Sequence, residues 1–397
     1  MKIFKITIVF FVLIFLLSCQ AVQDTREVID LTNDAEFLYK TVYDESLYSS
    51  GYFMPEDMAA VFENEILFYN YNPAQKGFTL YNKKNNTKRE VGDEYKCVVS
   101  SASYVIIDEA YYTSEVVVNN VGNEILRVIE VTSNGEFNVL KEYSRAKEVS
   151  PFVYFCRYDE TKFMYTHSAG EKTYIEVYDV KSKTFSNFMM LEATEKDKKY
   201  LERVSVSDDK IYVVVCENNQ YYLEIYNRDK ILTQKMILDL PLFDISAMLR
   251  FNVVNNYLFF TNWNSEQAVY RLDKDEIIAI NIDYLENVDK ITDLTLYPYG
   301  LSSVYEEYTG LLYCTRDNHP STGKNMDNRL YALNFDTGKI KSIGIEKSGN
   351  IPYLGGVICD EDGNILIMVK ENKESEENEW YLLSNEFLKE VFNSIEN

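Results

Sequence analysis

A small set of aromatic, basic and polar side chains could form a binding surface, because each follows or ends a strand-like run. Trp263 is the most informative of them, since the chain has only two tryptophans. Flat aromatic faces beside oriented polar groups are what a sugar- or peptide-binding surface needs. The candidate binding residues are Trp263, Asn262, Arg316, Asp317, His319, His167, Tyr69, Tyr71 and Tyr299.

The two histidines of the chain, His167 and His319, are candidates for the binding face, and a metal role for them would need a further ligand that the sequence does not reveal. Both are expected in loops between the second and third strands of a repeated unit, and two exposed loop histidines without a chemical role are the alternative interpretation. Zinc sites need several Cys or His ligands, but the sequence contains no CxxC pair and no calcium-loop pattern of spaced Asp and Asn. We therefore predict neither a metal nor a cofactor.

Catalytic patterns are sparse as well. The sequence contains no G-x-S-x-G nucleophile elbow, no HExxH and no Gly-rich phosphate loop. Two loop carboxylates such as Asp317 and Glu217 could meet as the acid and base of a polysaccharide hydrolase or lyase. That activity is the alternative to a binding function, and no catalytic residue is assigned.

The elements that position these residues come from a repeated unit of about 48 residues. Each unit reads as two hairpins, with β-rich runs on either side of polar turns. The residues just before the last turn of each unit are Tyr81, Ile129, Tyr178, Tyr226, Leu272, Leu333 and Leu383, at spacings of 48, 49, 48, 46, 61 and 50. Seven such units predict seven four-stranded antiparallel blades, an all-β propeller.

Six blades, with an irregular first unit, is the alternative. Residues 36–397 are predicted to form one propeller domain with an N-terminal extension at residues 36–56, in which Phe37 to Tyr48 pack outside the blades or cover an edge. The first strand of each unit is expected to be innermost. All four strands of the last blade are expected to come from the C-terminal region through Phe392, without a swapped N-terminal strand.

Two turns carry a resemblance to known proteins. Asn334-Phe335-Asp336-Thr337-Gly338-Lys339 and the turn from Tyr178 to Thr184 look like the D-x-x-T-G-K turns of bacterial seven-bladed propellers. The resemblance covers the chain from about Asp57 onward. The Trp-Asp repeat ends and the sialidase, kelch and integrin motifs are absent, so the resemblance implies a fold but no activity.

The loops between second and third strands should lie on one face, together with the links between blades. Three of these loops are long: Ser114–Glu124, Thr315–Asn328 and Lys370–Glu379. Long loops on a rigid scaffold are where binding usually occurs, so this loop-rich face is the predicted binding face. The acidic run Glu371–Glu379 is read as solvated charge, with a basic partner as the alternative.

The N-terminus predicts export. Lys2 and Lys5 precede the apolar run Ile6–Leu17, which is too short to span a bilayer but suits a signal peptide. Leu16-Leu17-Ser18-Cys19 resembles the lipobox of bacterial lipoproteins, which implies cleavage before Cys19 and lipid on its sulfur. Residues 1–18 are then the signal peptide and residues 19–35 a polar tether. The expected location is lipid-anchored and extracytoplasmic, at the cell surface or on the periplasmic side.

The net charge and the other cysteines limit the kinds of partner that the chain can bind. The net charge is −23, or −25 once the two signal-peptide lysines are removed, and such a surface repels nucleic acid. The other five cysteines lie in apolar runs and are expected to be buried thiols rather than a disulfide framework: Cys97, Cys156, Cys216, Cys314 and Cys359. We expect a binding or scaffold module for a protein or carbohydrate partner at the cell envelope.

Overall fold

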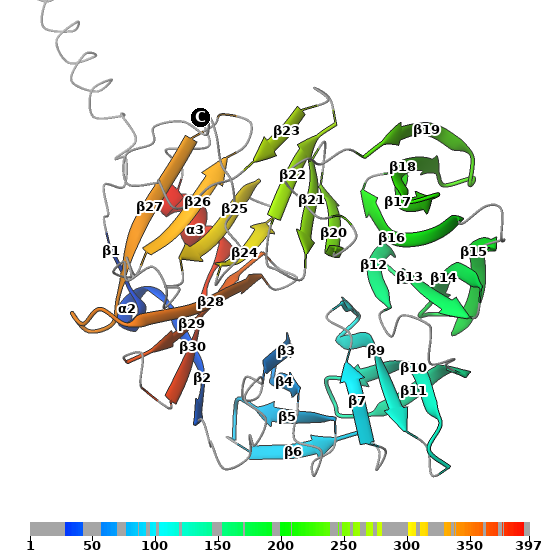
Figure 1. The fold of residues 1–397 in the computed structure, drawn as a ribbon. Helices are drawn as coiled ribbons and strands as arrows, with labels where there is room; N and C mark the ends of the chain where they lie inside the picture. The colour runs from blue at the N-terminus through cyan, green and yellow to red at the C-terminus, as the bar shows by residue number, and fades with distance from the viewer. Residues whose placement is uncertain are drawn as a thin grey trace, which may run out of the picture.

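The chain folds into seven antiparallel sheets that are arranged as the blades of a ring (Figure 1). The computed structural model describes residues 28–42, 57–69, 77–85, 87–92, 96–100, 103–118, 121–144, 153–169, 171–192, 199–207, 209–238, 245, 248–254, 257–262, 267–272, 276–279, 301–306, 310–316, 329–334, 337, 339–359, 363–371, 375 and 377–392. The predicted seven-bladed propeller is confirmed, and the six-bladed alternative is wrong.

Blades 1 to 4 follow one another along the chain, each built from consecutive strands. Blade 1 contains β3 (Asp57–Val61), β4 (Glu65–Tyr69), β5 (Phe78–Asn82) and β6 (Thr87–Val91). Blade 2 contains β7 (Lys96–Ser100), β8 (Val105–Ile107), β9 (Ala110–Val118), β10 (Glu124–Thr132) and β11 (Phe137–Ser144). Blade 3 contains β12 (Tyr154–Asp159), β13 (Lys162–Ala169), β14 (Lys172–Asp179) and β15 (Thr184–Glu192), and blade 4 contains β16 (Lys199–Ser207), β17 (Lys210–Glu217), β18 (Gln220–Asn227) and β19 (Leu232–Ile237).

Blades 5 to 7 complete the ring, and the last two take in strands from the N-terminus. Blade 5 contains β20 (Met248–Val254), β21 (Tyr257–Asn262), β22 (Gln267–Arg271) and β23 (Glu276–Ala279). Blade 6 contains β24 (Leu301–Glu306), β25 (Leu311–Arg316), β26 (Arg329–Asn334) and β27 (Lys339–Glu346), with β1 (Val28–Asp30) as a fifth, parallel strand on β27. Blade 7 contains β28 (Tyr353–Cys359), β29 (Ile365–Lys370), β30 (Glu377–Leu383) and β2 (Glu36–Val42).

The tight turns use polar residues with positive φ in place of glycine, as expected from the small number of glycines. Asp108 and Glu109 have φ of 51° and 60° in the turn between β8 and β9. Asn218 and Asn219 have φ of 53° and 65° between β17 and β18. Two-residue hairpin turns with both φ positive match the twist of the flanking strands, and Asn and Asp tolerate this conformation better than most residues.

The ring is closed by the N-terminal strand β2, which corrects the predicted closure. β2 pairs antiparallel with β30, with Glu36 opposite Leu382 and Val42 opposite Glu377, and so provides the outermost strand of blade 7. Residues 36–42 are therefore part of a blade rather than an extension outside it. The segment beyond β30, which the sequence analysis assigned to a fourth strand, is instead the helix α3 (Asn385–Phe392).

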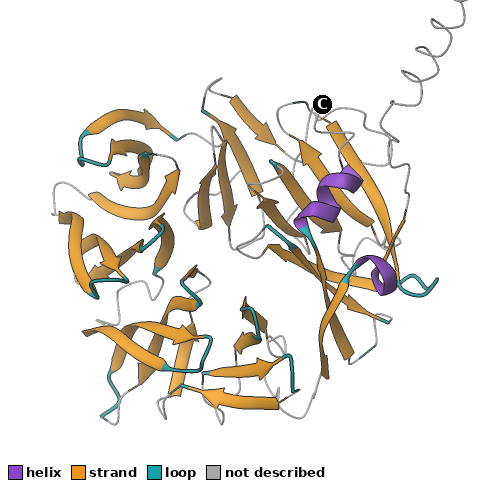
Figure 2. Cartoon of the chain, turned by 180° about the vertical axis from the view of Figure 1, so that it is seen from behind, coloured by secondary structure: helices purple, strands orange, loops and turns teal. Residues whose placement is uncertain are grey.

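The helix forms because its apolar residues repeat with helical rather than strand spacing. Leu388, Val391 and Phe392 are fully buried and lie on one side of α3. The hydroxyl of Ser384 accepts a hydrogen bond from the Phe387 amide at 3.2 Å, which caps the N-terminus of the helix. Figure 2 shows α3 and the short helix α2 (Leu31–Asp34) beside the sheets of blades 6 and 7.

The segment predicted as a polar tether is ordered at its end. Its residues 28–34 form β1 and α2, and Ile29 and Leu31 are fully buried against blade 6. The N-terminal segment thus passes from the edge of blade 6 to the edge of blade 7. Within the part of the chain that the structure describes, no helix is long and apolar enough to cross a membrane.

Buried apolar clusters lie between neighbouring blades, as expected for sheets that cannot bury both faces alone. Among the described residues, six such clusters join blades 1–2, 2–3, 3–4, 4–5, 6–7 and 7–1. In β17, Ile211 and Val213 pack toward blade 3, whereas Tyr212 and Val214 pack toward blade 5. Two cysteines of the described residues have free thiols. Cys216 is buried, and Cys156 is half-buried and packs against the cluster between blades 3 and 4.

Candidate functional site

Most of the predicted binding residues fall at or beyond the ends of second strands. Tyr69, Asn262 and Arg316 are the last residues of β4, β21 and β25, as the repeat predicted. The others are outside the described residues: Trp263, Asp317, His319, Tyr71 and Tyr299. Their binding role stays a prediction.

His167 is described, and its predicted place in an exposed loop is wrong. It lies inside β13, and only 5% of its surface is exposed. The strand continues to Ala169 and β14 begins at Lys172, so the connection is too short to hold the histidine. The imidazole stacks on Tyr174 with ring centroids 4.9 Å apart, and the ring of Tyr143 packs against it at a tilt of 34°, with centroids 4.1 Å apart.

A buried polar network surrounds His167 and joins blade 2 to blade 3. The Lys141 ammonium of β11 donates to both carboxylate oxygens of Glu176 on β14, at 2.8 Å from each. The hydroxyls of Tyr143 and Tyr165 also donate to this carboxylate. His167 Nε2 lies 3.5 Å from the same carboxylate, and neither nitrogen of the ring makes a hydrogen bond within the described part of the protein.

The surroundings of Glu176 set its charge. Burial alone would raise the pKa of this carboxyl, but the contacts with His167, Lys141 and the two tyrosines lower it well below the usual glutamate range. The hydroxyl pKa values of Tyr143 and Tyr165 are raised, chiefly by burial and further by the neighbouring carboxylate. Because Glu176 stays ionised and the tyrosines stay protonated, this network acts as a fixed link between two blades.

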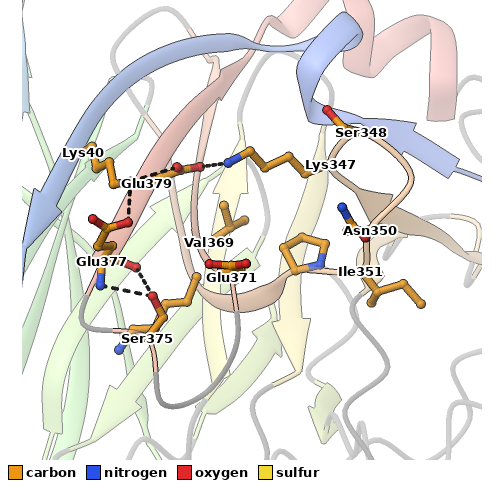
Figure 3. Close-up of a pocket in the computed structure, with 12 residues that line it drawn as sticks. Lys40, Lys347, Ser348, Asn350, Ile351, Val369, Glu371, Ser375, Glu377 and Glu379 are labelled. Carbon is orange, nitrogen blue, oxygen red and sulfur yellow. Dashed lines mark hydrogen bonds and ion pairs between the residues drawn. The ribbon is translucent and has the colours of Figure 1, made fainter.

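A cavity of about 600 Å³ opens between blades 6 and 7, on the predicted binding face (Figure 3). Three segments line it: β2 through Lys40, the link between the two blades at residues 347–352, and the end of β29 with the start of β30 between Val369 and Glu379. The third segment contains the long acidic loop that the sequence pointed to. We take this cavity as the candidate site.

An ion-pair chain forms one wall of the cavity. Lys40 contacts both Glu377 and, at 3.8 Å, Glu379, and Lys347 contacts Glu379 as well. The Tyr381 hydroxyl donates to Glu379 at 2.9 Å. Both lysines are thus neutralised by glutamates of β30, as the dashed lines in Figure 3 show.

The pKa values of this wall favour fixed charges. Burial opposes ionisation of Glu379, but hydrogen bonds from Lys347 and Tyr381 and the charge of Lys40 lower its pKa. The hydrogen bond to Glu377 raises the pKa of Lys40. A carboxyl held in its ionised form can serve as a base or a counter-ion, but it is poorly suited to act as the general acid that glycoside cleavage requires.

Other groups of the cavity remain available. The carboxylate of Glu371 points into the middle of the cavity in Figure 3, and it makes no ion pair or hydrogen bond with another described residue. Ile351 is 65% exposed at the rim. Within the described residues, no group of three or more His, Cys, Asp or Glu side chains is placed to hold a metal ion.

Sequence reasoning found one part of this cavity and missed another. The run from Glu371 to Glu379 was visible as an acidic loop on the expected face. Lys40 was missed because β2 was not recognised as a strand of blade 7. The available signal was composition, because the run Phe37-Leu38-Tyr39 followed by Thr41-Val42 is rich in aromatic and β-branched residues that favour strands.

The fold is shared with many solved structures at low sequence identity. The WD40 β-propeller domain of Doa1 is 8% identical, with a TM-score of 0.47 over 89% of this chain and 99% of that chain. BamB from Moraxella catarrhalis is 10% identical, with a TM-score of 0.41 over 87% and 99%. PorZ, a bacterial surface component of the type-IX secretion system of Porphyromonas gingivalis, is 9% identical, with a TM-score of 0.43 over 85% of this chain and 37% of that chain.

These likenesses concern the fold alone. No protein-family model matches the chain, and no curated protein matches its sequence. The class of the protein is therefore given by its own topology, a seven-bladed β-propeller closed by an N-terminal strand.

Proposed function

We propose that this chain is a lipid-anchored, extracytoplasmic lipoprotein that binds a protein or glycan partner, as a binding module or scaffold of the cell envelope. Lipid on Cys19 would hold it at the cell surface or on the periplasmic side. The observation that carries the binding function is the cavity of about 600 Å³ between blades 6 and 7, lined by the link between these blades, by Lys40 of β2 and by the end of β29 with the start of β30. Pockets of this size are typical of ligand sites.

The chemistry of the cavity supports binding more than hydrolysis. Two of its three described carboxylates, Glu377 and Glu379, are engaged by lysines, so no second carboxylate without a lysine partner lies beside the third, Glu371. The propeller supplies a rigid frame, since six blade interfaces are closed by buried apolar clusters in the described part of the chain. A rigid frame with variable loops is the usual arrangement of binding surfaces.

Capture of partners from membranes tests this function. Full-length chain in detergent, carrying Trp263→Ala together with Arg316→Ala, should lose partners that the wild type retains after cross-linking and affinity purification. The matched control is Glu63→Ala with Lys210→Ala, at the turns of the opposite face, which should retain them. Unchanged partners in the first pair would refute binding through the loop-rich face.

A further inference from the structure

We propose that the junction of blades 2 and 3 binds a hard, highly charged cation, with ferric iron as the expected metal. Its four ligands would be the phenol oxygens of Tyr143 and Tyr165, Nε2 of His167 and one carboxylate oxygen of Glu176. These four donor atoms meet there, and too few hydrogens are available to join them. The site is separate from the cavity between blades 6 and 7 and does not depend on the partner-binding function.

Three oxygen atoms form a close triangle at this junction. The hydroxyl oxygens of Tyr143 and Tyr165 lie 2.7 Å apart, and each contacts Oε2 of Glu176, at 2.5 Å for Tyr165. His167 Nε2 lies 3.5 Å from the same carboxylate oxygen. Ligands held at about 2.0–2.1 Å around a small hard cation stand about 3 Å from their neighbours in an octahedral shell. The spacing of these donors therefore matches a shared metal ion.

Hydrogen bonds do not account for the whole triangle. Each tyrosine hydroxyl carries one hydrogen and an ionised carboxylate carries none, so two hydrogens must serve three oxygen–oxygen contacts. If both hydroxyls donate to Glu176, the contact between Tyr143 and Tyr165 brings two lone pairs together. One contact lacks a hydrogen whichever way the hydroxyls turn. A cation bound to all three oxygens would remove that repulsion.

The imidazole of His167 is a second, independent observation. It is almost fully buried, and neither of its nitrogens makes a hydrogen bond with another described residue. Burying a polar atom without a partner is unfavourable. Tyr174 stacks on the ring and Tyr143 packs against it, so the imidazole is held with Nε2 toward Glu176. A metal bond to Nε2 would satisfy this nitrogen.

The charges of the junction suit a trivalent ion. Lys141 neutralises Glu176, and because the lysine side chain is 30% exposed, its ammonium can turn to water when a metal takes its place. Binding would release the two hydroxyl protons, which leaves two phenolates and one carboxylate against the three charges of Fe³⁺. Carboxylate and phenolate oxygens are hard ligands, and imidazole also suits iron. The net charge of −23 attracts cations at long range.

The proposal departs from the sequence expectation of no metal, which was based on cysteine, histidine and calcium-loop patterns. The four ligand residues come from β11, β13 and β14 of two blades. Two of them are tyrosines, which are too abundant in this chain to mark a site by themselves. Only the packing of blade 2 against blade 3 brings the four together.

A titration with iron tests the proposal. The full-length chain in detergent is first treated with a chelator, dialysed, and then titrated with ferric nitrilotriacetate. We expect the visible charge-transfer absorption that phenolate ligands give to Fe³⁺, saturating at a single iron per chain. Tyr143→Phe and Tyr165→Phe keep the ring packing and should each weaken binding at least about tenfold, and the double variant should lose the absorption.

The matched control is Tyr178→Phe, which removes a hydroxyl outside the triangle from the same buried cluster. It should leave the absorption and the affinity unchanged. Hydrogen–deuterium exchange of the wild type locates the metal without any variant. Iron should slow exchange in β11, β13 and β14 and leave β18 of blade 4 as it was.

Three results of the titration would each overturn the proposal: no visible absorption, an absorption that survives the double variant, or an equal loss in Tyr178→Phe. Slower exchange only outside blades 2 and 3 would show iron bound elsewhere on the acidic protein and would overturn it too. None of these results bears on partner binding, which capture from membranes tests separately.

Discussion

Glu176 is the residue whose chemical state depends most on its surroundings. Its carboxylate meets Lys141, Tyr143, Tyr165 and His167 at the junction of blades 2 and 3. Equivalent positions of the third strands in blades 2 and 4 also carry buried charges: Arg127 pairs with Glu115 and Glu142, and Glu224 pairs with Lys199 and Lys235. Three consecutive blades thus place a paired charge at one position of the repeat.

Replacing Glu176 with Gln should destabilise the fold by about 1–3 kcal/mol at neutral pH, since Lys141 loses its partner in a half-buried site. The folded pKa of Glu176 is lowered, so its stabilising contribution is complete above the usual glutamate pKa and declines as the pH falls toward the folded value. In urea unfolding, the difference in the free energy of unfolding between wild type and variant should stay constant from about pH 7 to 5. This difference should become smaller below about pH 5.

The control for this prediction is Glu136→Gln, an exposed glutamate in the turn between β10 and β11. It should change stability by less than about 0.5 kcal/mol. A Glu176→Gln variant that is as stable as the control at neutral pH would contradict the proposed role of the network as a link between blades.

His167 illustrates what the sequence could not reveal at the residue scale. Its apolar and aromatic neighbours along β13 predicted a strand, but where that strand ends depends on the length of its turn to β14, which varies between blades. Trp380, by contrast, heads the third strand of its unit, a position that predicts a core residue, and it is 8% exposed in β30. Positions well inside a repeated strand are predictable, whereas positions near its ends are not.

At the scale of elements, the N-terminal segment is part of the propeller, whereas the sequence predicted an extension outside the blades. Strand β2 closes blade 7, and Leu38 on it packs with Ile66 and Phe68 of blade 1 and with Trp380. Its partner β30 lies more than 300 residues away in the sequence. Strand pairing was predictable inside each unit because the hairpins are local, but a pairing between the two ends of the chain leaves no local signal.

Leu38→Ala should therefore open the closure of the ring. We expect a loss of about 2–4 kcal/mol from the cavity left in the interface. Hydrogen–deuterium exchange should be faster in β30, which loses protection when β2 detaches. The exposed neighbour Glu36→Ala, on the same strand, should leave exchange in β30 unchanged. Unaltered protection of β30 in Leu38→Ala would show that β2 does not secure the closure.

The helix α3 shows a second kind of ambiguity at this scale. The run Phe387–Phe392 contains aromatic and β-branched residues that read as a strand. The fourth-strand position of blade 7 is taken by β2, so these residues fold instead as a helix that buries Leu388 and Val391 between blades 6 and 7. The occupation of the strand position by β2 therefore decides the secondary structure of this segment, against the intrinsic strand propensity of its residues.

For the molecule as a whole, the proposed lipid anchor would join the propeller at the edge of blade 6, where β1 lies. Residues between Cys19 and β1 number only eight, so a lipid on Cys19 would hold the edge of blade 6 within about 30 Å of the membrane surface. The cavity lies between blades 6 and 7. A partner bound there would be kept close to the lipid headgroups, which suits a scaffold of the envelope.

Cys19→Ala tests the anchor. The wild-type chain should fractionate with membranes and take up an alkynyl fatty acid during growth, whereas the variant should not be labelled, because its only predicted acylation site is lost. Cys216→Ala, which alters a buried thiol, should be labelled as the wild type is. Labelling of the Cys19→Ala variant would contradict the lipoprotein assignment.

The pairing of β2 with β30 also determines when blade 7 can form during synthesis of the chain. During synthesis β1 and β2 emerge before the other strands, and β30, the partner of β2, emerges only when nearly all of the chain has been made. Until then β2 has an unpaired edge, and the interface between blade 7 and blade 1 stays exposed. A prematurely terminated chain would lack β30 and could not complete blade 7, so it would expose an unpaired strand edge and unburied apolar side chains to proteases and chaperones.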